Sequence, residues 1–520
     1  MELEKFPQEV FETVLKFLDL NTIKALRLTN RRLSEICIGP RFLGFIQQPS
    51  LDVSPQSFRS LHSLACNPAL SKVIHSLKFV ATSFDSTELA KNVASGKYVV
   101  RTVKGPFFEA TTMKYTPEEL FNANSDLEWL KEKQELRASE SSSEMIGLLR
   151  IALQKFSGLE FIHLDGAVIT GPRCTQRKST EHGEWHPLWM RASHVLSLVL
   201  TAMVQSGVSV KKLDVYRNTP RCCIPSGHIT SYVSGLSPNQ LAGLSKDLVS
   251  FAISLSAEIQ TVVEFDDSDD DELSEYEKAS RTTFGSSKGH LTCEDPRATL
   301  ANGTQGVTSL LKYASSLQEL DLSFRHALYG KRLDSYDRIV ENIASEAQFP
   351  KLQHCAFSGF FAKEESILLL LQKHPDIRSL KLHDCDLTAG SWTPIFGHLS
   401  RSMPALDNLD LSNLSGNHMT HRKRPTGVDH PGVNNTEQEQ EMVLLEVGGL
   451  VSLYPVWDTE PRSRLRTLSK GDTYIVHTRS FNQEELKKGL VFRPEPGGRT
   501  KGSAEGMWWG RSRQALYGCP

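Results

Sequence analysis

The sequence predicts a mixed α/β protein in which a three-helix N-terminal module is followed by an irregular repeat solenoid, or horseshoe, with disordered insertions. Three observations lead to this fold class. Apolar residues near the start follow helical spacing, one short apolar phrase recurs along the chain, and helical stretches separate its later copies. A short parallel strand followed by a helix, repeated many times, builds a horseshoe.

The first predicted helix begins at Pro7, since the first turn of a helix does not use the N–H that proline lacks. Its apolar side chains recur at helical spacing along one face: Phe11, Val14, Leu15 and Leu18. Val10 and Phe17 widen this stripe beyond the need of an isolated helix. The helix is therefore expected to be covered from two directions.

Two more short helices are expected directly after the first. Asp19 and Asn21 supply turn and cap chemistry for the second helix, and Thr29 or Asn30 can cap the third. The pair Gly39-Pro40 is expected to stop the third helix. Three helices in so short a span bury too little surface to be stable alone, so the module should pack against a partner or the rest of the chain.

Five short runs near the N-terminus match a known pattern: Phe6-Pro7-Gln8-Glu9-Val10, Val14-Leu15, Leu18-Asp19-Leu20, Leu26-Arg27-Leu28 and Asn30-Arg31-Arg32-Leu33. Together they resemble the F-box, which opens with Leu-Pro-x-Glu and docks on the Skp adaptor of cullin-based ubiquitin ligases. The sequence departs from that pattern at Phe6, where the family usually has Leu, and at Leu33, where it often has Trp. Both departures keep apolar bulk.

The F-box resemblance implies a docking surface for the Skp adaptor and, through it, for cullin. The residues that it assigns to adaptor binding are Phe6, Pro7, Glu9, Val10, Val14, Leu15, Leu18, Leu20, Leu26, Leu28 and Leu33. The other interpretation of this stretch is a plain helical hairpin that packs only on its own domain.

An apolar phrase with the spacing L-x-x-L-x-L recurs after the helical module. Its copies are Ile74-Leu77-Phe79, Leu159-Ile162-Leu164, Val210-Leu213-Val215, Leu317-Leu320-Leu322, Leu352-Cys355-Phe357, Ile377-Leu380-Leu382 and Leu406-Leu409-Leu411. The copy that starts at Ile377 fits the leucine-rich repeat pattern L-x-x-L-x-L-x-x-C-x-L, with Cys385 at the cysteine position. In such a repeat the phrase residues point into the core, and the Cys or Asn closes backbone hydrogen bonds in the turn.

Helical stretches lie between the later copies, at 364–371 and 392–403, and a further helix is expected at 239–259. The last copies fall about 25 to 35 residues apart, near the period of such repeats, whereas the earlier gaps are longer. Because the phrase also occurs by chance in leucine-rich chains, the repeat interpretation depends on several copies with helices between them. In style the chain is similar to F-box proteins of filamentous fungi that carry irregular leucine-rich repeats.

The predicted domain boundaries follow these patterns. The F-box spans 1–38, a helical linker 39–69, the leucine-rich-repeat-like solenoid 70–415, a polar linker 416–441, and a C-terminal cap or tail 442–520. Within the solenoid, 264–305 contains the acidic run EFDDSDDDELSEYE, whose dense like charge predicts a disordered insertion. Ser268 in this run stands in a context that acidophilic kinases favour, although a solvated insertion without a role is the other interpretation.

Composition places the chain among ordinary soluble globular proteins, with 39% hydrophobic and 23% charged residues. A formal net charge of −2 gives no general attraction to nucleic acid. The charged start lacks a secretory signal, and Arg191 and His194 break the most apolar stretch, so no membrane partner is expected and the cytosol or nucleus is favoured. The nine cysteines include no C-x-x-C pair, which favours reduced thiols.

The motifs of common active sites are missing from the sequence. It has no phosphate-binding loop, no G-x-S-x-G elbow and no H-E-x-x-H helix, and no cofactor is expected. The best metal candidates are Cys174, His182 and His186, but Gly183 and Pro187 disfavour the helix that would align the two histidines, so a surface loop is preferred. Aromatic and basic side chains in the tail suit base stacking or a buried cap: Trp508, Trp509, Arg511 and Arg513.

These features together favour a substrate receptor rather than an enzyme. The F-box would hold the adaptor and the solenoid an unidentified target protein, so that this chain contributes proximity. Two other readings of the function stay open: an F-box scaffold that works outside the ligase, and a repeat scaffold whose N-terminal helices only cap the solenoid. An enzyme with an unfamiliar site is a third.

Overall fold

The computed structural model describes much of the chain: residues 7–104, 107–172, 185–219, 222–257, 261–264, 289–292, 303–325, 336–390, 392–412, 414–416, 445–447, 450–452, 465–467, 473–475 and 479–482. The chain divides into two compact units. Unit 1 comprises Met1–Lys178 and His194–Leu213, and unit 2 comprises Ser179–Ser193 and Asp214–Pro520. The fold is mixed α/β and its strands pair mostly in parallel, as the sequence predicts.

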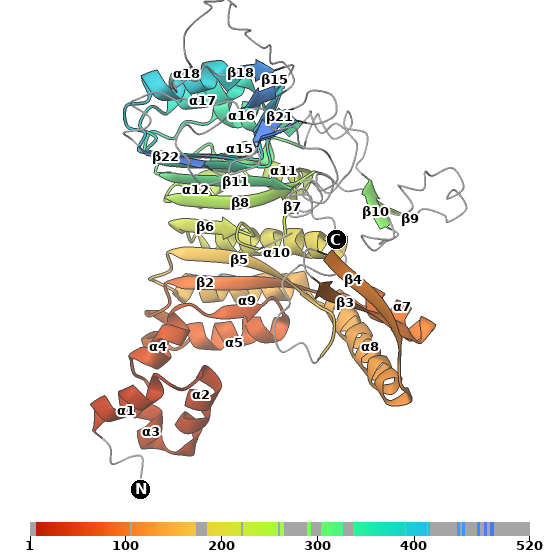
Figure 1. Ribbon diagram of the computed structural model, residues 1–520. Helices are drawn as coiled ribbons and strands as arrows, with labels where there is room; N and C mark the ends of the chain where they lie inside the picture. The colour runs from red at the N-terminus through yellow and green to blue at the C-terminus, as the bar shows by residue number, and fades with distance from the viewer. Residues whose placement is uncertain are drawn as a thin grey trace, which may run out of the picture. The chain divides into compact units, whose positions relative to one another are not determined.

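Unit 1 opens with four short helices (Figure 1): α1 (Gln8–Leu15), α2 (Leu20–Thr29), α3 (Arg31–Ile36) and α4 (Pro40–Gln47). The predicted caps are confirmed, because Asp19 accepts a hydrogen bond from the N–H of Thr22 and Asn30 accepts one from the N–H of Leu33. Gly39-Pro40 follows the end of α3 as expected, but Pro40 also opens α4, where its missing N–H costs nothing. The module therefore has a fourth helix, which lies in the segment that the sequence predicts as a helical linker.

A short parallel sheet follows in unit 1: β1 (Ser50–Asp52), β2 (Ser76–Phe84) and β5 (Phe161–Ile169). The surrounding helices are α5 (Pro55–Ala65), α6 (Pro68–Ser71) and α9 (Ser142–Lys155). The expected helical linker at 39–69 thus also contains a strand, β1, which extends the sheet beyond β2. Helix α10 (Trp185–Ser206) and strand β6 (Lys212–Val215) include residues of both units.

An insertion that the sequence did not predict separates β2 from α9. Its elements are α7 (Thr87–Ser95), β3 (Lys97–Lys104), β4 (Phe107–Lys114) and α8 (Pro117–Ala138). Strands β3 and β4 form a two-stranded antiparallel hairpin. A complete capping box starts α8, since the Thr116 hydroxyl accepts from the N–H of Glu119 and the Glu119 carboxylate accepts from the N–H of Thr116.

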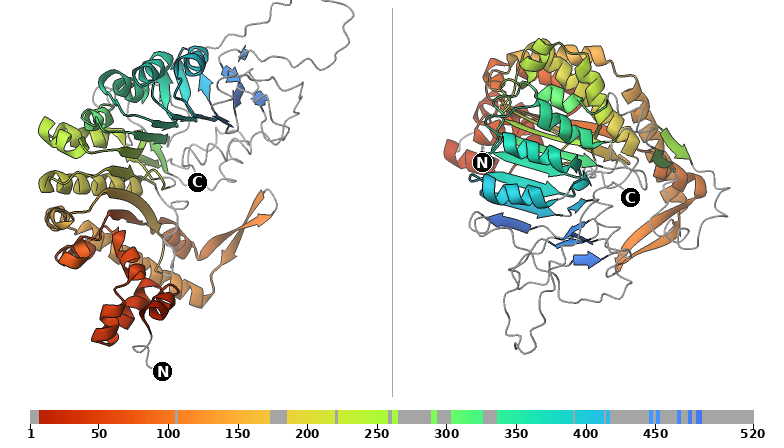
Figure 2. Two further views of the ribbon diagram at one scale, coloured as in Figure 1. Left: turned by 90° about the vertical axis from the view of Figure 1, so that its left-hand side faces the viewer. Right: turned by 90° about the horizontal axis from the view of Figure 1, so that it is seen from above.

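The core of unit 2 is a run of parallel strands: β8 (Ser250–Ser256), β11 (Glu319–Arg325), β12 (His354–Ser358), β14 (Ser379–His383) and β16 (Asn408–Ser412). Strand β7 (Ile224–Pro225) joins β8 in parallel, and β22 (Arg479–Asn482) pairs antiparallel with β16. The helices of this unit are α11 (Ser226–Ser234), α12 (Pro238–Ser245), α15 (Gly306–Leu311), α16 (Asp337–Glu346), α17 (Glu364–Lys373) and α18 (Trp392–Ser402). The helices α16, α17 and α18 lie side by side over one face of these strands (Figure 2).

Smaller sheets complete the described elements of unit 2. Three short strands pair in parallel beside the main sheet: β13 (Phe361–Lys363), β15 (Asp386–Ala389) and β17 (Ser415–Gly416). The others form antiparallel pairs: β9 (Thr261–Glu264) with β10 (Gly289–Thr292), β18 (Leu445–Val447) with β19 (Leu450–Ser452), and β20 (Leu465–Thr467) with β21 (Thr473–Ile475). Most of the acidic insertion, the polar linker and the tail lies outside the described residues, as do Cys174, His182 and the tail tryptophans.

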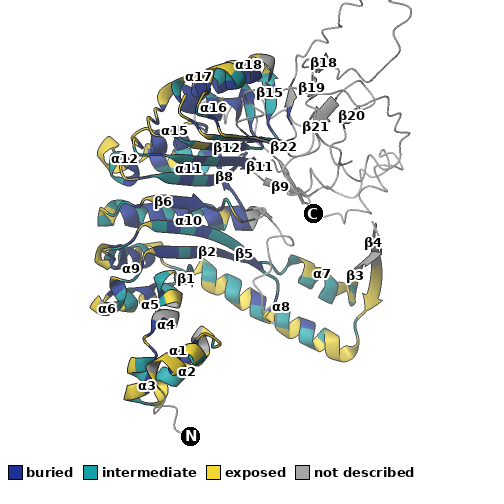
Figure 3. Cartoon of the chain, turned by 60° about the vertical axis from the view of Figure 1, so that its left-hand side comes forward, coloured by how far each residue is buried: buried dark blue, intermediate teal, exposed yellow. Residues whose placement is uncertain are grey.

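All seven apolar phrases coincide with strands, and every phrase residue is buried. The main strands are drawn mostly in the dark blue of buried residues (Figure 3). In unit 2 their second members lie in register across adjacent strands: Leu320, Cys355, Leu380 and Leu409. Their third members form the next row: Leu322, Phe357, Leu382 and Leu411. The two helices expected between the later phrases are also present, as α17 and α18.

The helix expected at 239–259 is wrong over its second half. Only α12 is helical there, and residues 250–256 form β8. The buried side chains of Phe251, Ile253 and Leu255 alternate, which places them on one face of a strand. Leu248, Phe251 and Ile253 thereby form an eighth copy of the phrase, and Phe251 lies in register with Leu320.

Candidate interaction surfaces

The N-terminal helices have a small apolar core of their own. Its side chains are at most 9% exposed: Phe11, Leu15, Ile23, Leu33, Cys37, Phe42 and Ile46. Helix α4 contacts both α1 and α2, and the guanidinium of Arg27 lies 4.3 Å from the ring centroid of Phe42. The fourth helix therefore supplies part of the cover that the wide apolar stripe of α1 requires.

Large apolar side chains remain exposed on these helices and on the turns between them. Phe17 is 85% exposed and Leu28 is 88% exposed, far more than any other large apolar residue of the described chain except Phe121. Val10 and Ile38 are exposed to a smaller degree, at 45% and 43%. Four large apolar side chains are thus exposed within residues 10–38, and a contiguous exposed patch of such side chains marks an interaction site.

The residues assigned to adaptor binding by the F-box resemblance fall into three groups in the structure. Four are exposed: Pro7, Glu9, Val10 and Leu28. Three are half-buried: Val14, Leu18 and Leu26. Leu15 and Leu33 are buried in the module core, where they support the helices instead of offering a surface. Phe6 and the side chain of Leu20 lie outside the described part of the chain.

Phe17 is the exposed residue that the assignment omits. Its signal in the sequence was the widening of the α1 stripe, but periodicity alone does not separate it from a buried residue such as Phe11. The difference arises because α1 ends at Leu15 and Phe17 stands in the turn before α2. The helix packing covers Phe11 and leaves Phe17 in water.

A second surface is the face of the unit 2 sheet opposite to the phrase residues. Its side chains alternate with the buried ones, so that polar residues stand in register on adjacent strands. One row contains Asp321, Ala356, Lys381 and Asp410, and the next contains Ser323, Ser358, His383 and Ser412. The sheet thus presents both signs of charge within a few strands.

Arg217 connects this polar face to the turn after β6. Its Nε donates to Asp321 Oδ1 over 2.7 Å, and an η nitrogen donates to the Ser358 hydroxyl over 3.5 Å. The backbone N–H of Arg217 donates to Asp214, so the turn holds the side chain in place. The preceding residue, Tyr216, is buried and has a φ of 58°, a conformation that is strained for a tyrosine. Its hydroxyl donates to the carbonyl of Ala192 over 3.0 Å.

His383 and Asp410 form a partly buried pair on the same face. The His383 Nε2 lies 3.2 Å from Asp410 Oδ2, and Lys381 Nζ lies 3.7 Å from the same oxygen. Burial lowers the pKa of His383, and the contact with Asp410 opposes this effect only in part. Ser358 lies in register with His383, but its hydroxyl accepts from Arg217, and no hydrogen bond of the described structure links it to the imidazole.

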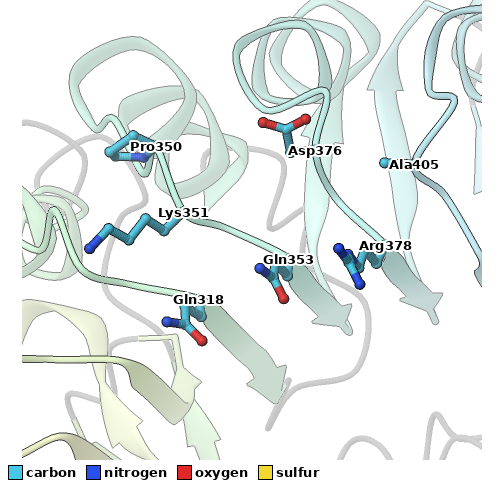
Figure 4. A pocket seen from close by; sticks show the side chains of 7 residues that line it. All are labelled: Gln318, Pro350, Lys351, Gln353, Asp376, Arg378 and Ala405. Carbon is cyan, nitrogen blue, oxygen red and sulfur yellow. The ribbon is translucent and has the colours of Figure 1, made fainter.

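A shallow pocket of about 310 Å³ lies at the start of strands β11, β12, β14 and β16 (Figure 4). One row of its lining comes directly before three of these strands: Gln318, Gln353 and Arg378. The other row comes from the preceding turns: Pro350, Lys351, Asp376 and Ala405. Five of its seven lining residues therefore have polar side chains, and three of these five are charged.

Metal binding finds no support in the residues that the structure describes. No three side chains of His, Cys, Asp or Glu gather there in a way that suits a metal ion. His186 lies in the first turn of α10, so the predicted surface loop is wrong from Trp185 onward. The helix can form there because the first turn of a helix tolerates a proline such as Pro187. Cys355 and Cys385 are buried free thiols, and burial raises the pKa of each.

Comparison with protein-family models and with curated proteins finds no match to this chain. Among the described helices, none is both long enough and apolar enough to cross a membrane.

Proposed function

We propose that this chain is the substrate-recognition subunit of an SCF-type cullin ubiquitin ligase. In this proposal the N-terminal helices act as an F-box that docks on the Skp adaptor, and the strand–helix repeats form a leucine-rich-repeat solenoid that binds a target protein. The chain itself carries out no chemistry, because ubiquitin transfer belongs to other subunits. Its partners are the adaptor, cullin through the adaptor, and the target, without nucleic acid or membrane.

The observation that carries this proposal is the exposure of Phe17 and Leu28 on a module with a core of its own. An apolar side chain of this size stabilises a complex by about 1.5 to 3 kcal/mol when it is fully buried. The buried phrase residues and the Cys385 turn support the repeat part of the proposal. The Sγ of Cys385 lies 3.3 Å from the His383 carbonyl oxygen and 3.7 Å from the Phe357 carbonyl oxygen.

Adaptor capture tests the proposal directly. The variant Phe17→Asp with Leu28→Asp should capture purified Skp adaptor at least about tenfold more weakly than the natural chain, because two apolar contacts are lost. Both side chains are exposed, so the free energy of unfolding should change by no more than about 0.5 kcal/mol per residue. Affinity is measured by titration of the adaptor against the immobilised full chain.

A matched control is available on α8, where Phe121 and Leu136 are 74% and 53% exposed. The variant Phe121→Asp with Leu136→Asp makes the same chemical change and should capture the adaptor normally. Equal capture by the natural chain and the Phe17/Leu28 variant, or no capture by either, would overturn the proposed adaptor surface.

A further inference from the structure

The pocket at the start of the unit 2 strands has no free backbone groups along its inner row. The carbonyls of Gln318, Gln353 and Arg378 each accept two N–H groups from the next strand. The N–H groups of these three residues each donate to the carbonyl of a residue that lies directly before the neighbouring strand. The acceptors are Val249, Gln318 and Gln353 in turn. Along this inner row a ligand is therefore bound by side chains, and these side chains decide its chemistry.

Three charged side chains line this pocket without ion-pair partners in the described chain: Lys351, Asp376 and Arg378. All three are exposed. Lys351 and Gln353 precede β12, and Arg378 precedes the adjacent strand β14, with the amide of Gln353 lying between the two cations (Figure 4). Two cations beside two carboxamides suit a ligand that combines anionic groups with peptide amides, because a carboxamide donates and accepts hydrogen bonds.

We propose that this pocket binds an extended acidic segment of a protein, in which separate anionic side chains contact Lys351 and Arg378 while Gln318 and Gln353 bind backbone amides. That this protein is a ligase target depends on the proposed function, whereas the binding itself does not. Asp376 adds selectivity, since its carboxylate repels any further anionic group in the pocket. The favoured segment thus carries isolated acidic residues instead of an unbroken acidic run.

Peptide binding to the full chain tests this inference. The probes are fluorescent peptides of alternating Glu and Ala, the same peptide with Gln for Glu, and one with phosphoserine for Glu, measured by fluorescence anisotropy at low salt. The Glu or the phosphoserine peptide should bind and the Gln peptide should bind at least about fivefold more weakly. The stronger of the two anionic peptides identifies carboxylate or phosphate as the recognised group.

Charge reversal locates the site. Lys351→Glu with Arg378→Glu should weaken binding of the anionic peptide at least about tenfold. The control Lys312→Glu with Arg401→Glu reverses two exposed cations of the same unit that do not line the pocket, and should bind as the natural chain does. Asp376→Asn should tighten binding of a peptide with consecutive Glu residues about two- to fivefold, a gain that misfolding does not produce.

Equal binding of the Glu, phosphoserine and Gln peptides, no binding of any of them, or equal effects of the two charge-reversal variants would overturn the inference. Tighter binding of a thymidine oligonucleotide than of the anionic peptides would also overturn it in favour of nucleic acid. Adaptor capture by the Lys351/Arg378 variant is measured in parallel and should be normal, so failure of the pocket is distinguishable from failure of the adaptor surface.

Discussion

Individual residues of this chain take roles that depend on burial more than on type. Leu15 and Leu28 are both leucines of the F-box-like stretch, yet one is 0% and the other 88% exposed. His374 and His383 both belong to unit 2, but they differ in their surroundings. His374 is almost fully buried, and both of its ring nitrogens contact backbone groups. The same side chain can therefore stabilise the fold at one position and be available to a partner at another.

Leu15→Ala is expected to lower the free energy of unfolding of unit 1 by about 2 to 5 kcal/mol, because it empties a fully buried position. Leu28→Ala should change it by no more than about 0.5 kcal/mol. Urea unfolding followed by circular dichroism checks both values. Equal stabilities of the two variants would mean that Leu15 is not a core residue. Loss of adaptor capture in Leu15→Ala alone would not show that Leu15 contacts the adaptor, because this buried residue supports the fold of the module.

His374 should make the fold sensitive to acid. Its Nε2 accepts from the N–H of Phe349 over 3.0 Å, and its Nδ1 lies 2.7 Å from the Leu370 carbonyl, which fixes the neutral form. Burial lowers the pKa of His374 below the usual 6.5, with the Leu370 contact opposing it. The unfolded chain then takes up a proton first as the pH falls. Stability from this group is complete above about pH 6.5 and declines below it, until the folded pKa is reached.

The urea midpoint of the natural chain should fall between pH 7.5 and pH 5.5, with His374 contributing part of the fall. The variant His374→Gln is expected to be less stable at pH 7.5 and to lose less on acidification. A fall of the same size in both proteins would exclude His374 as the group responsible.

At the scale of elements, the repeat phrase predicted where strands form, because alternate buried residues are a property of the local sequence. β8 was missed because its phrase follows directly after α12, so 239–259 looked like one apolar helical run. The insertion between β2 and α9 has no repeat and its hairpin strands pair only with each other, so no periodic signal marked it. The exposure of Phe17 depends on how helices pack, which periodicity does not contain.

Some glycines of unit 2 are required by the backbone, and others are not. Gly359, directly after β12, has a φ of 75°, and a Cβ there would overlap the Phe324 carbonyl oxygen. Gly359→Ala should therefore destabilise unit 2 by about 2 kcal/mol or more, since backbone must move. Gly397 in α18 has open space around its Cβ position, so Gly397→Ala should raise stability by about 0.5 to 1 kcal/mol. Thermal unfolding of both variants checks the opposite signs.

At the scale of the whole chain, a truncation that removes the N-terminal module without damage to the repeats must be made at a particular residue. Phe42 and Ile46 of α4 are buried and α4 contacts α1 and α2, so a cut after residue 38 would expose them. Gln47 belongs to the other side, because its carbonyl accepts from the N–H of His75 just before β2. The helical module therefore extends through α4 to residue 46, which places the first part of the predicted helical linker at 39–69 with the module.

Deletion of residues 1–46 should leave the rest of the chain folded and abolish adaptor capture. Anionic peptide binding should persist, since every residue of the pocket lies in unit 2. Deletion of residues 1–38 should instead give a less soluble protein, because Phe42 and Ile46 lose their cover. Circular dichroism, adaptor titration and peptide anisotropy on the two truncated chains check these outcomes. If the chain without residues 1–46 unfolds, the four helices are part of the repeat core, and the scaffold alternative replaces the receptor.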